Sequence, residues 1–194
     1  MTVTPLAARA TSPARRRILD AATERFYAEG IRAVSADRLI ADAHISKVTF
    51  YRHFPTKDDL VVAYLSETSE RERAIVASQR GLLAGNPGAV LRWYASMIGS
   101  ISCMAGFRGC PFINAAAEYP DAAHPARRIV DEHRAWLTDQ AIEVLTELGV
   151  ESVGTKADQL MMLRDGAMIA GYVGRRPAEV EAAVVAGGKA IIRA

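Results

Sequence analysis

The sequence has little of what cross-links a secreted protein or anchors one in a membrane. Only two of its 194 residues are cysteine, and two cysteines exclude a framework of several disulfides. No uninterrupted apolar run is close to the length of about 18 residues that a membrane-spanning helix needs. No apolar signal-peptide core precedes the first expected helix. We therefore expect a cytoplasmic protein with no membrane partner, whose 50% apolar residues suffice to form its core.

Motifs for catalysis, cofactors and metals are also missing. The chain contains no GxSxG, P-loop, HExxH or GxGxxG sequence, so we expect neither an enzyme nor a bound cofactor. Asp121, His124, Asp131 and His133 match no zinc or iron spacing, so no metal site is expected. β-Branched residues never alternate with period two in this Ala-, Glu- and Arg-rich chain, which predicts an all-α fold.

The small net charge of +2 hides an uneven distribution. Residues 1–60 carry ten Lys and Arg against seven Asp and Glu, a net of +3, whereas the remainder carries fourteen against fifteen, a net of −1. The positive excess therefore lies in the N-terminal third, where it favours contact with nucleic acid.

Residues 35–57 predict two short helices joined by a sharp turn. Ser35 and Ser46 are typical N-caps of the two helices. His44 occupies the turn position that usually needs a left-handed residue, which His tolerates better than most side chains do. In the second helix, Phe50 and Phe54 are four residues apart and are expected to face the core. The inward residues of the first helix recur at spacings of three and four: Ala36, Leu39, Ile40 and Ala43.

This arrangement suits the major groove of DNA. The groove is about 12 Å wide and admits one helix, whose first turn reaches base edges while flanking groups bind phosphates. Pro55 ends the second helix, and Thr56 with Asp59 forms a capping box that opens the next one. The residues left facing outward on the second helix are basic, hydroxylic or aromatic, apart from one valine: Lys47, Val48, Thr49, Tyr51, Arg52 and His53.

At these residues the chain resembles the TetR family of transcriptional regulators. The resemblance covers roughly the first third of the chain, and two departures, His44 and Val48, fall where the family usually has Gly. Val48 brings a branched methyl pair to the groove, so base preference does not carry over from relatives. The matching residues are Gly30, Ser35, Ile40, Ala41, Ala43, Ile45, Ser46, Lys47, Thr49, Tyr51, His53, Phe54, Lys57 and Leu60.

The resemblance and the outward positions together predict which residues contact DNA. Lys47 and Thr49 are candidates for contact with bases or the adjacent phosphate, and Val48 lies beside them. Candidates for phosphate contact are Ser35, Tyr51, His53, Lys57 and, from an earlier basic run, Arg16. Two alternatives remain open: Tyr51 as a core aromatic residue, and the Arg15–Arg17 run as an ordinary solvated patch.

The rest of the chain predicts further helices, about nine in total. We expect a helix-turn-helix DNA-binding domain over residues 1–55, with residues 1–11 a mobile tail, and an effector-binding and dimerisation domain over residues 56–194. Small residues recur in the last two helices and permit close helix packing; we assign these helices to a homodimer interface, the alternative being completion of a monomer core. Beyond the capping box the expected helices cover residues 56–79, a segment from 87, 111–118, 125–148, 155–174 and 177–192.

The family resemblance implies an effector site in this larger domain. Soft and aromatic side chains there are sufficient for an apolar pocket, although plain core packing is the favoured interpretation of any single one of them. The candidate ligand-binding residues are Trp93, Met97, Phe107, Phe112, Asn114, His133, Trp136 and Met162.

We thus predict a ligand-responsive repressor that leaves a near-palindromic operator when an apolar or aromatic effector binds. One alternative is a helical protein-interaction dimer whose DNA reader no longer functions. Another is a thiol-sensing regulator that uses Cys103 and Cys110, two residues that buried, inert cysteine explains as well.

Overall fold

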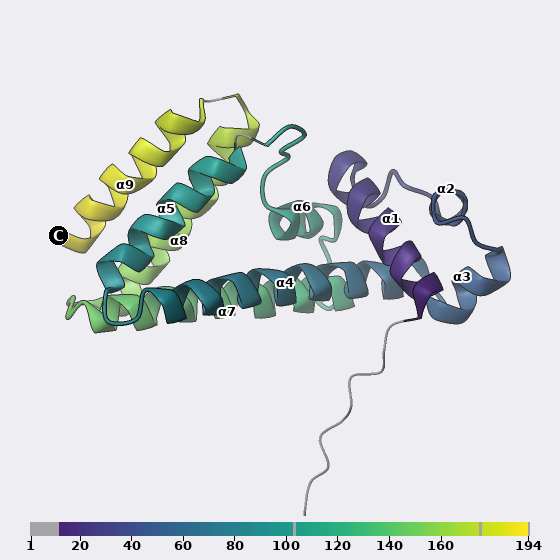
Figure 1. Ribbon diagram of the computed structural model, residues 1–194, viewed down its shortest axis with the longest axis horizontal. Coiled ribbons are helices and arrows are strands. Elements are labelled where there is room, and N and C mark those ends of the chain that lie inside the picture. Colours follow the sequence, from purple (N-terminus) through teal and green to yellow (C-terminus); the bar gives the residue numbers. More distant parts are fainter. Residues whose placement is uncertain (1–11, 103, 175, 194) are drawn as a thin grey trace, which may run out of the picture. The chain divides into compact units, whose positions relative to one another are not determined.

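The structure is a computed structural model that describes residues 12–102, 104–174 and 176–193 (Figure 1). All the regular secondary structure in these residues is helical, which confirms the predicted all-α fold. The predicted mobile tail, residues 1–11, lies outside the described residues. The described residues form nine helices: α1 (Pro13–Glu29), α2 (Ala36–Asp42), α3 (Lys47–His53), α4 (Lys57–Leu82), α5 (Pro87–Ser102), α6 (Pro111–Glu118), α7 (Pro125–Glu147), α8 (Val153–Tyr172) and α9 (Pro177–Arg193).

The chain forms two compact units, Met1–Tyr64 and Leu65–Ala194, which divide inside α4. In the first unit three N-caps form as the sequence predicts: Ser35, Ser46 and also Ser12, which precedes a proline at the first helical position. The hydroxyls of Ser12, Ser35 and Ser46 accept hydrogen bonds from backbone N–H groups three residues later, at 3.1–3.2 Å. Each cap satisfies a donor that the first helical turn leaves free. Thr56 and Asp59 form the predicted capping box, with Asp59 accepting from the Thr56 N–H at 2.9 Å.

The core of the first unit is formed by one face from each of its helices. Phe50 and Phe54 of the α3 segment point inward and are almost wholly buried. Arg25 of α1 reaches Asp42 at the end of α2, with 2.8 Å between Nε and Oδ2. The other buried side chains of this core include Ile18, Leu19, Ala22, Phe26, Leu39 and Leu60. Apolar burial on these faces therefore fixes which side of α3 remains free.

The turn between α2 and α3 has the predicted left-handed residue. His44 has a φ of 51° and is exposed, and its N–H donates to the Ala41 carbonyl at 3.1 Å. The next N–H, that of Ile45, donates to the Ile40 carbonyl at 3.3 Å. These two bonds close the end of α2 and turn the chain sharply into α3.

In the second unit, α5, α8 and α9 pack together, and α7 packs against α8 and α6 (Figure 1). Gly171 of α8 lies so close to α5 that a Cβ at this position would be 2.9 Å from the Ser102 Cβ. At Gly187 of α9, a Cβ would be 3.0 Å from the Leu163 Cδ1. Part of the small-residue pattern in α8 and α9 therefore serves packing within one chain.

The inner face of α7 differs slightly from the one that the apolar spacing of the sequence predicts, namely Ile129, His133, Trp136, Leu137, Val144 and Leu148. His133, Leu137 and Val144 are buried as predicted, but Ile129 and Trp136 are only half-buried and Leu148 is exposed. The remaining buried positions are Ala126, Val130 and Leu145. The buried face of α7 therefore only partly coincides with the predicted one, and it lies where α7 packs against α6 and α8. No helix among the described residues is long and apolar enough to cross a membrane.

Candidate nucleic-acid interface and ligand cavity

The first turn of α3 presents side chains that the protein core does not use. Phe50 is fully buried, whereas Val48, two residues earlier, is 77% exposed. Lys47 is also exposed and lies 3.5 Å from the Asp37 carboxylate of α2. A surface pair of this kind contributes little to stability, so the Lys47 ammonium can exchange its partner for a phosphate or a base edge.

Hydroxyl groups surround this turn. The Thr49 hydroxyl lies 2.9 Å from the Ser46 hydroxyl that caps α3. Ser35 caps α2 and is exposed. Tyr51 is 40% exposed while the edge of its ring contacts Phe50, with 5.3 Å between ring centroids. Tyr51 therefore has one side on the core and leaves the other free, so it is not a simple core aromatic residue.

The other residues of this unit that are predicted to contact phosphate make more contacts within the protein. The His53 Nε2 lies 3.3 Å from the Ser12 hydroxyl, which joins the end of α3 to the cap of α1. The Arg16 guanidinium forms an ion pair with Asp20 at 2.7 Å. Lys57 lies over the Phe26 ring, 5.8 Å from its centroid. These three groups contribute to packing within the unit, and their predicted contacts with phosphate stay predictions.

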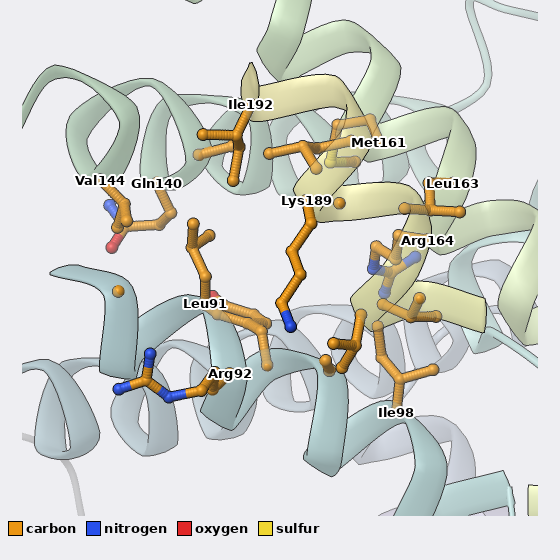
Figure 2. Close-up of a pocket in the computed structure, with 18 of the residues that line it drawn as sticks. Leu91, Arg92, Ile98, Gln140, Val144, Met161, Leu163, Arg164, Lys189 and Ile192 are labelled. Atoms are coloured by element: carbon orange, nitrogen blue, oxygen red, sulfur yellow. The ribbon is translucent and has the colours of Figure 1, made fainter. Parts of the chain in front are cut away.

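A separate cavity of about 370 Å³ lies in the second unit between α5, α7, α8 and α9 (Figure 2). Its walls are mostly aliphatic. They include Leu91, Ile98, Leu137, Val144, Leu160, Met161, Leu163, Val184, Val185 and Ile192, together with the polar residues Arg92, Tyr94, Gln140, Arg164 and Lys189. A volume of this size is at the small end of the range for ligand pockets, which is about 300–1,000 Å³.

None of the eight side chains predicted to bind a ligand lines this cavity. The ring of Phe112 stacks on His133 at 3.6 Å, and both residues are buried in the core. The Asn114 amide donates to the Arg108 carbonyl at 2.9 Å. The others are distributed over several surfaces: Trp93 packs on Tyr94, Trp136 lies under the Arg73 guanidinium, Met97 and Phe107 are half-buried, and Met162 is 72% exposed.

His133 belongs to a buried polar cluster. Its Nδ1 lies 2.9 Å from the Ser69 hydroxyl, and its Nε2 lies 3.4 Å from the Glu72 carboxylate. Arg164 lies 3.9 Å from Glu72 and 3.1 Å from Asp165. Burial acts to raise the pKa of Glu72, but His133 and the Arg164 guanidinium outweigh burial and leave this pKa below its ordinary value. Glu72 is therefore an ionised group within a compensated cluster.

The described residues bear only in part on the thiol-sensing alternative and on metal binding. Cys110 is buried, with its sulfur 3.8 Å from the Arg164 guanidinium, while Cys103 lies outside the described residues. The thiol-sensing hypothesis therefore stays a prediction. In the part of the chain that the structure describes, no group of three or more His, Cys, Asp or Glu side chains is placed to hold a metal ion.

Comparison with known proteins agrees with this geometry. A family profile described as "Bacterial regulatory proteins, tetR family" matches residues 18–64. The chain is 43% identical to SCO4454, a TetR-family transcriptional regulator from Streptomyces coelicolor, with a TM-score of 0.88 over 94% of this chain and 96% of that one.

Two further similarities cover less of the chain or have lower sequence identity. The chain is 35% identical over 69 residues, 36% of either chain, to the uncharacterised HTH-type transcriptional regulator YvkB of Bacillus subtilis (strain 168). The reduced form of NemR from E. coli is 18% identical, with a TM-score of 0.79 over 91% of this chain and 96% of that one. At that identity the likeness concerns the fold alone.

Proposed function

Because this chain belongs to the TetR family of transcriptional regulators, we propose that it is a ligand-responsive repressor of a near-palindromic operator. TetR-family regulators bind operator DNA and form dimers. In this proposal residues 1–55 read DNA, residues 56–194 bind the effector and the second protomer, and the protein acts in the cytoplasm, where its operator lies.

One observation carries the DNA-reading part of the proposal. The first turn of α3 leaves Lys47 and Val48 largely exposed to solvent, although Phe50 anchors the helix in the core. A cation, an apolar methyl pair and the Thr49 hydroxyl on one helical turn can contact guanine, thymine methyl and phosphate groups respectively. In a dimer, two such turns about 34–36 Å apart would enter successive major grooves.

The dimer in this proposal forms through α8 and α9. One face of α8 packs against α5 and α9, yet large apolar side chains elsewhere on the helix remain in solvent: Met162 is 72% exposed and Ile169 54%, and Val173, directly after the helix, is 75% exposed. The outward residues of α9 are mostly alanine, namely Ala178, Ala182, Ala183, Ala186 and Ala190. Two copies of this pair would bury both surfaces in a four-helix bundle.

The effector in this proposal occupies the aliphatic cavity. Its binding would favour a spacing of the two recognition helices that no longer fits the operator, and DNA would weaken effector binding by the same factor. The cavity is the observation that supports this assignment, because well-packed cores leave few voids larger than a water molecule.

Selection of bound sequences from a random DNA library, followed by footprinting, tests the proposal. Lys47→Ala combined with Thr49→Ala should abolish protection of the selected operator while leaving the helical content and thermal midpoint unchanged. Arg128→Ala combined with Thr146→Ala is the matched control, since it removes the same two kinds of group from exposed positions of α7. Normal footprinting by the α3 double variant would refute the assignment.

A further inference from the structure

The charged side chains that line the cavity are all cationic. Arg92 of α5, Arg164 of α8 and Lys189 of α9 contribute to its walls, and no Asp or Glu does. The whole chain is nearly balanced, with 24 basic and 22 acidic residues, so this one-sided lining does not simply reflect composition. A cavity whose charged lining residues are all positive favours a negatively charged ligand.

The three cations differ in how far the protein already compensates them. Arg164 has Asp165 at 3.1 Å and Glu72 at 3.9 Å, so its charge is matched from within the fold. Among the described residues, no carboxylate lies within ion-pairing distance of Lys189 or Arg92. Lys189 extends from α9 into the cavity, whereas Arg92 lies at its α5 edge (Figure 2). Lys189 is therefore the cation best placed to meet a ligand.

The aliphatic walls of the cavity determine the part of the ligand that does not carry the negative charge. Leu91 and Ile98 of α5 and Leu160 of α8 meet here with Val184 and Ile192 of α9. These walls offer an apolar body many dispersion contacts and almost no hydrogen bonds. A ligand that fills the cavity must therefore combine an aliphatic or aromatic body with an anionic end.

Resting on the proposed function, we infer that the effector is an amphipathic carboxylic acid. Its apolar body lies among the aliphatic residues of α5, α7, α8 and α9, and its carboxylate pairs with the Lys189 ammonium, with Arg92 as a second, weaker partner. Cationic amphiphiles are excluded because each would bring a like charge next to Lys189.

Three ten-carbon probes that differ only in the head group test this inference: decanoate, decan-1-ol and decylamine. Their binding to the full-length protein without DNA is measured by isothermal titration calorimetry at pH 7. We expect saturable binding of decanoate, at least about tenfold weaker binding of decanol, and none of decylamine. Equal binding of decylamine or decanol, or no saturable binding of decanoate, would overturn the inference.

Variants then locate the head group. Lys189→Met should weaken decanoate binding about tenfold and Arg92→Met by less, whereas decanol binding should change in neither variant. Arg128→Met is the charge-matched control, because Arg128 is exposed on α7 and does not line the cavity. Unchanged decanoate affinity in the Lys189→Met protein, with the Arg92→Met protein also unchanged, contradicts the assignment.

A second readout separates this inference from the proposed function. Decanoate is added to the protein bound to its selected operator, and release is followed by fluorescence anisotropy. Release that Lys189→Met prevents supports both claims. Decanoate binding without release would refute the effector role within the proposed function, while the calorimetric result would still establish the cavity as a carboxylate site.

Discussion

The turn between α2 and α3 depends on a single side chain in a costly conformation. His44 has a φ of 51°, in the left-handed region that most residues avoid. We expect His44→Gly to be neutral or stabilising, because glycine adopts this conformation without a steric cost. His44→Val should lower the free energy of unfolding by about 1 kcal/mol or more. Urea denaturation measures both changes, and equal stability of the Gly and Val variants would contradict this account.

Glu72 links the buried cluster to the stability of the protein in acid. Because the pKa of Glu72 in the folded protein lies below its ordinary value of 4.5, the ionised carboxylate stabilises the fold above that pH. This contribution is lost as the pH falls through the lowered pKa, where Glu72 becomes protonated.

We therefore expect Glu72→Gln to cost about 1–3 kcal/mol of unfolding free energy at pH 7, since it removes the charge beside Arg164 and His133. The difference in unfolding free energy between the wild type and this variant should narrow as the pH falls below 4.5. It should be smallest below the lowered pKa, where the wild-type residue is also neutral in the fold. Denaturation at several pH values measures this. Glu70→Gln, at an exposed neighbouring position, is the control and should change little. A difference that stays constant with pH would show that folding does not lower the pKa of Glu72, which contradicts this account.

At the scale of helices, the close contact of α8 with α5 depends on Gly171. A methyl group there would meet the Ser102 Cβ at 2.9 Å and the Phe107 ring at 3.1 Å, and the Ser102 Cβ cannot rotate away. We expect Gly171→Ala to lower the melting temperature, at a cost of about 1–3 kcal/mol. Gly81→Ala in α4 meets nothing within 4 Å and should instead stabilise by up to about 1 kcal/mol. If both variants were more stable than the wild type, this result would contradict the close contact between α5 and α8 at Gly171.

The helices themselves could largely be predicted, because their ends are set by neighbouring residues. Ser12 before Pro13, Ser46 before Lys47 and the Thr56–Asp59 box each specify a helix start within four positions of sequence. In α7 the buried face was predicted only in part. Ile129 and Val130 are equally apolar neighbours, and packing against α6 and α8 decides that Val130 points inward.

The cavity could not be predicted from the sequence for a related reason. Its lining combines Leu91, Leu137, Leu160 and Val184, which share no motif and come from four separate helices. Sequence reasoning favoured aromatic and polar residues such as Phe112 and His133, yet these two stack on each other inside the core. The outward surface of α3 was predictable because its periodicity and caps are local.

At the scale of the whole molecule, the free face of α8 predicts how two chains meet. Ile169→Glu places a charge on the apolar surface proposed for the dimer and should yield monomers in sedimentation-velocity experiments. Ile75→Glu is the matched control, since Ile75 of α4 is similarly exposed, 47% against 54% for Ile169. If Ile169→Glu remained dimeric, or both variants dissociated alike, α8 would not be the specific interface.

The salt dependence of operator binding tests the central claim most directly, because it reports how many phosphates the protein neutralises. Fluorescence anisotropy with the selected operator gives the affinity as the salt concentration rises. A DNA-reading dimer should show two protomers per operator and a linear fall of log affinity with log salt, with a slope of about −0.9 for each contacted phosphate. A flat dependence, as expected for a protein-interaction dimer whose α3 surface no longer reads DNA, would contradict the account.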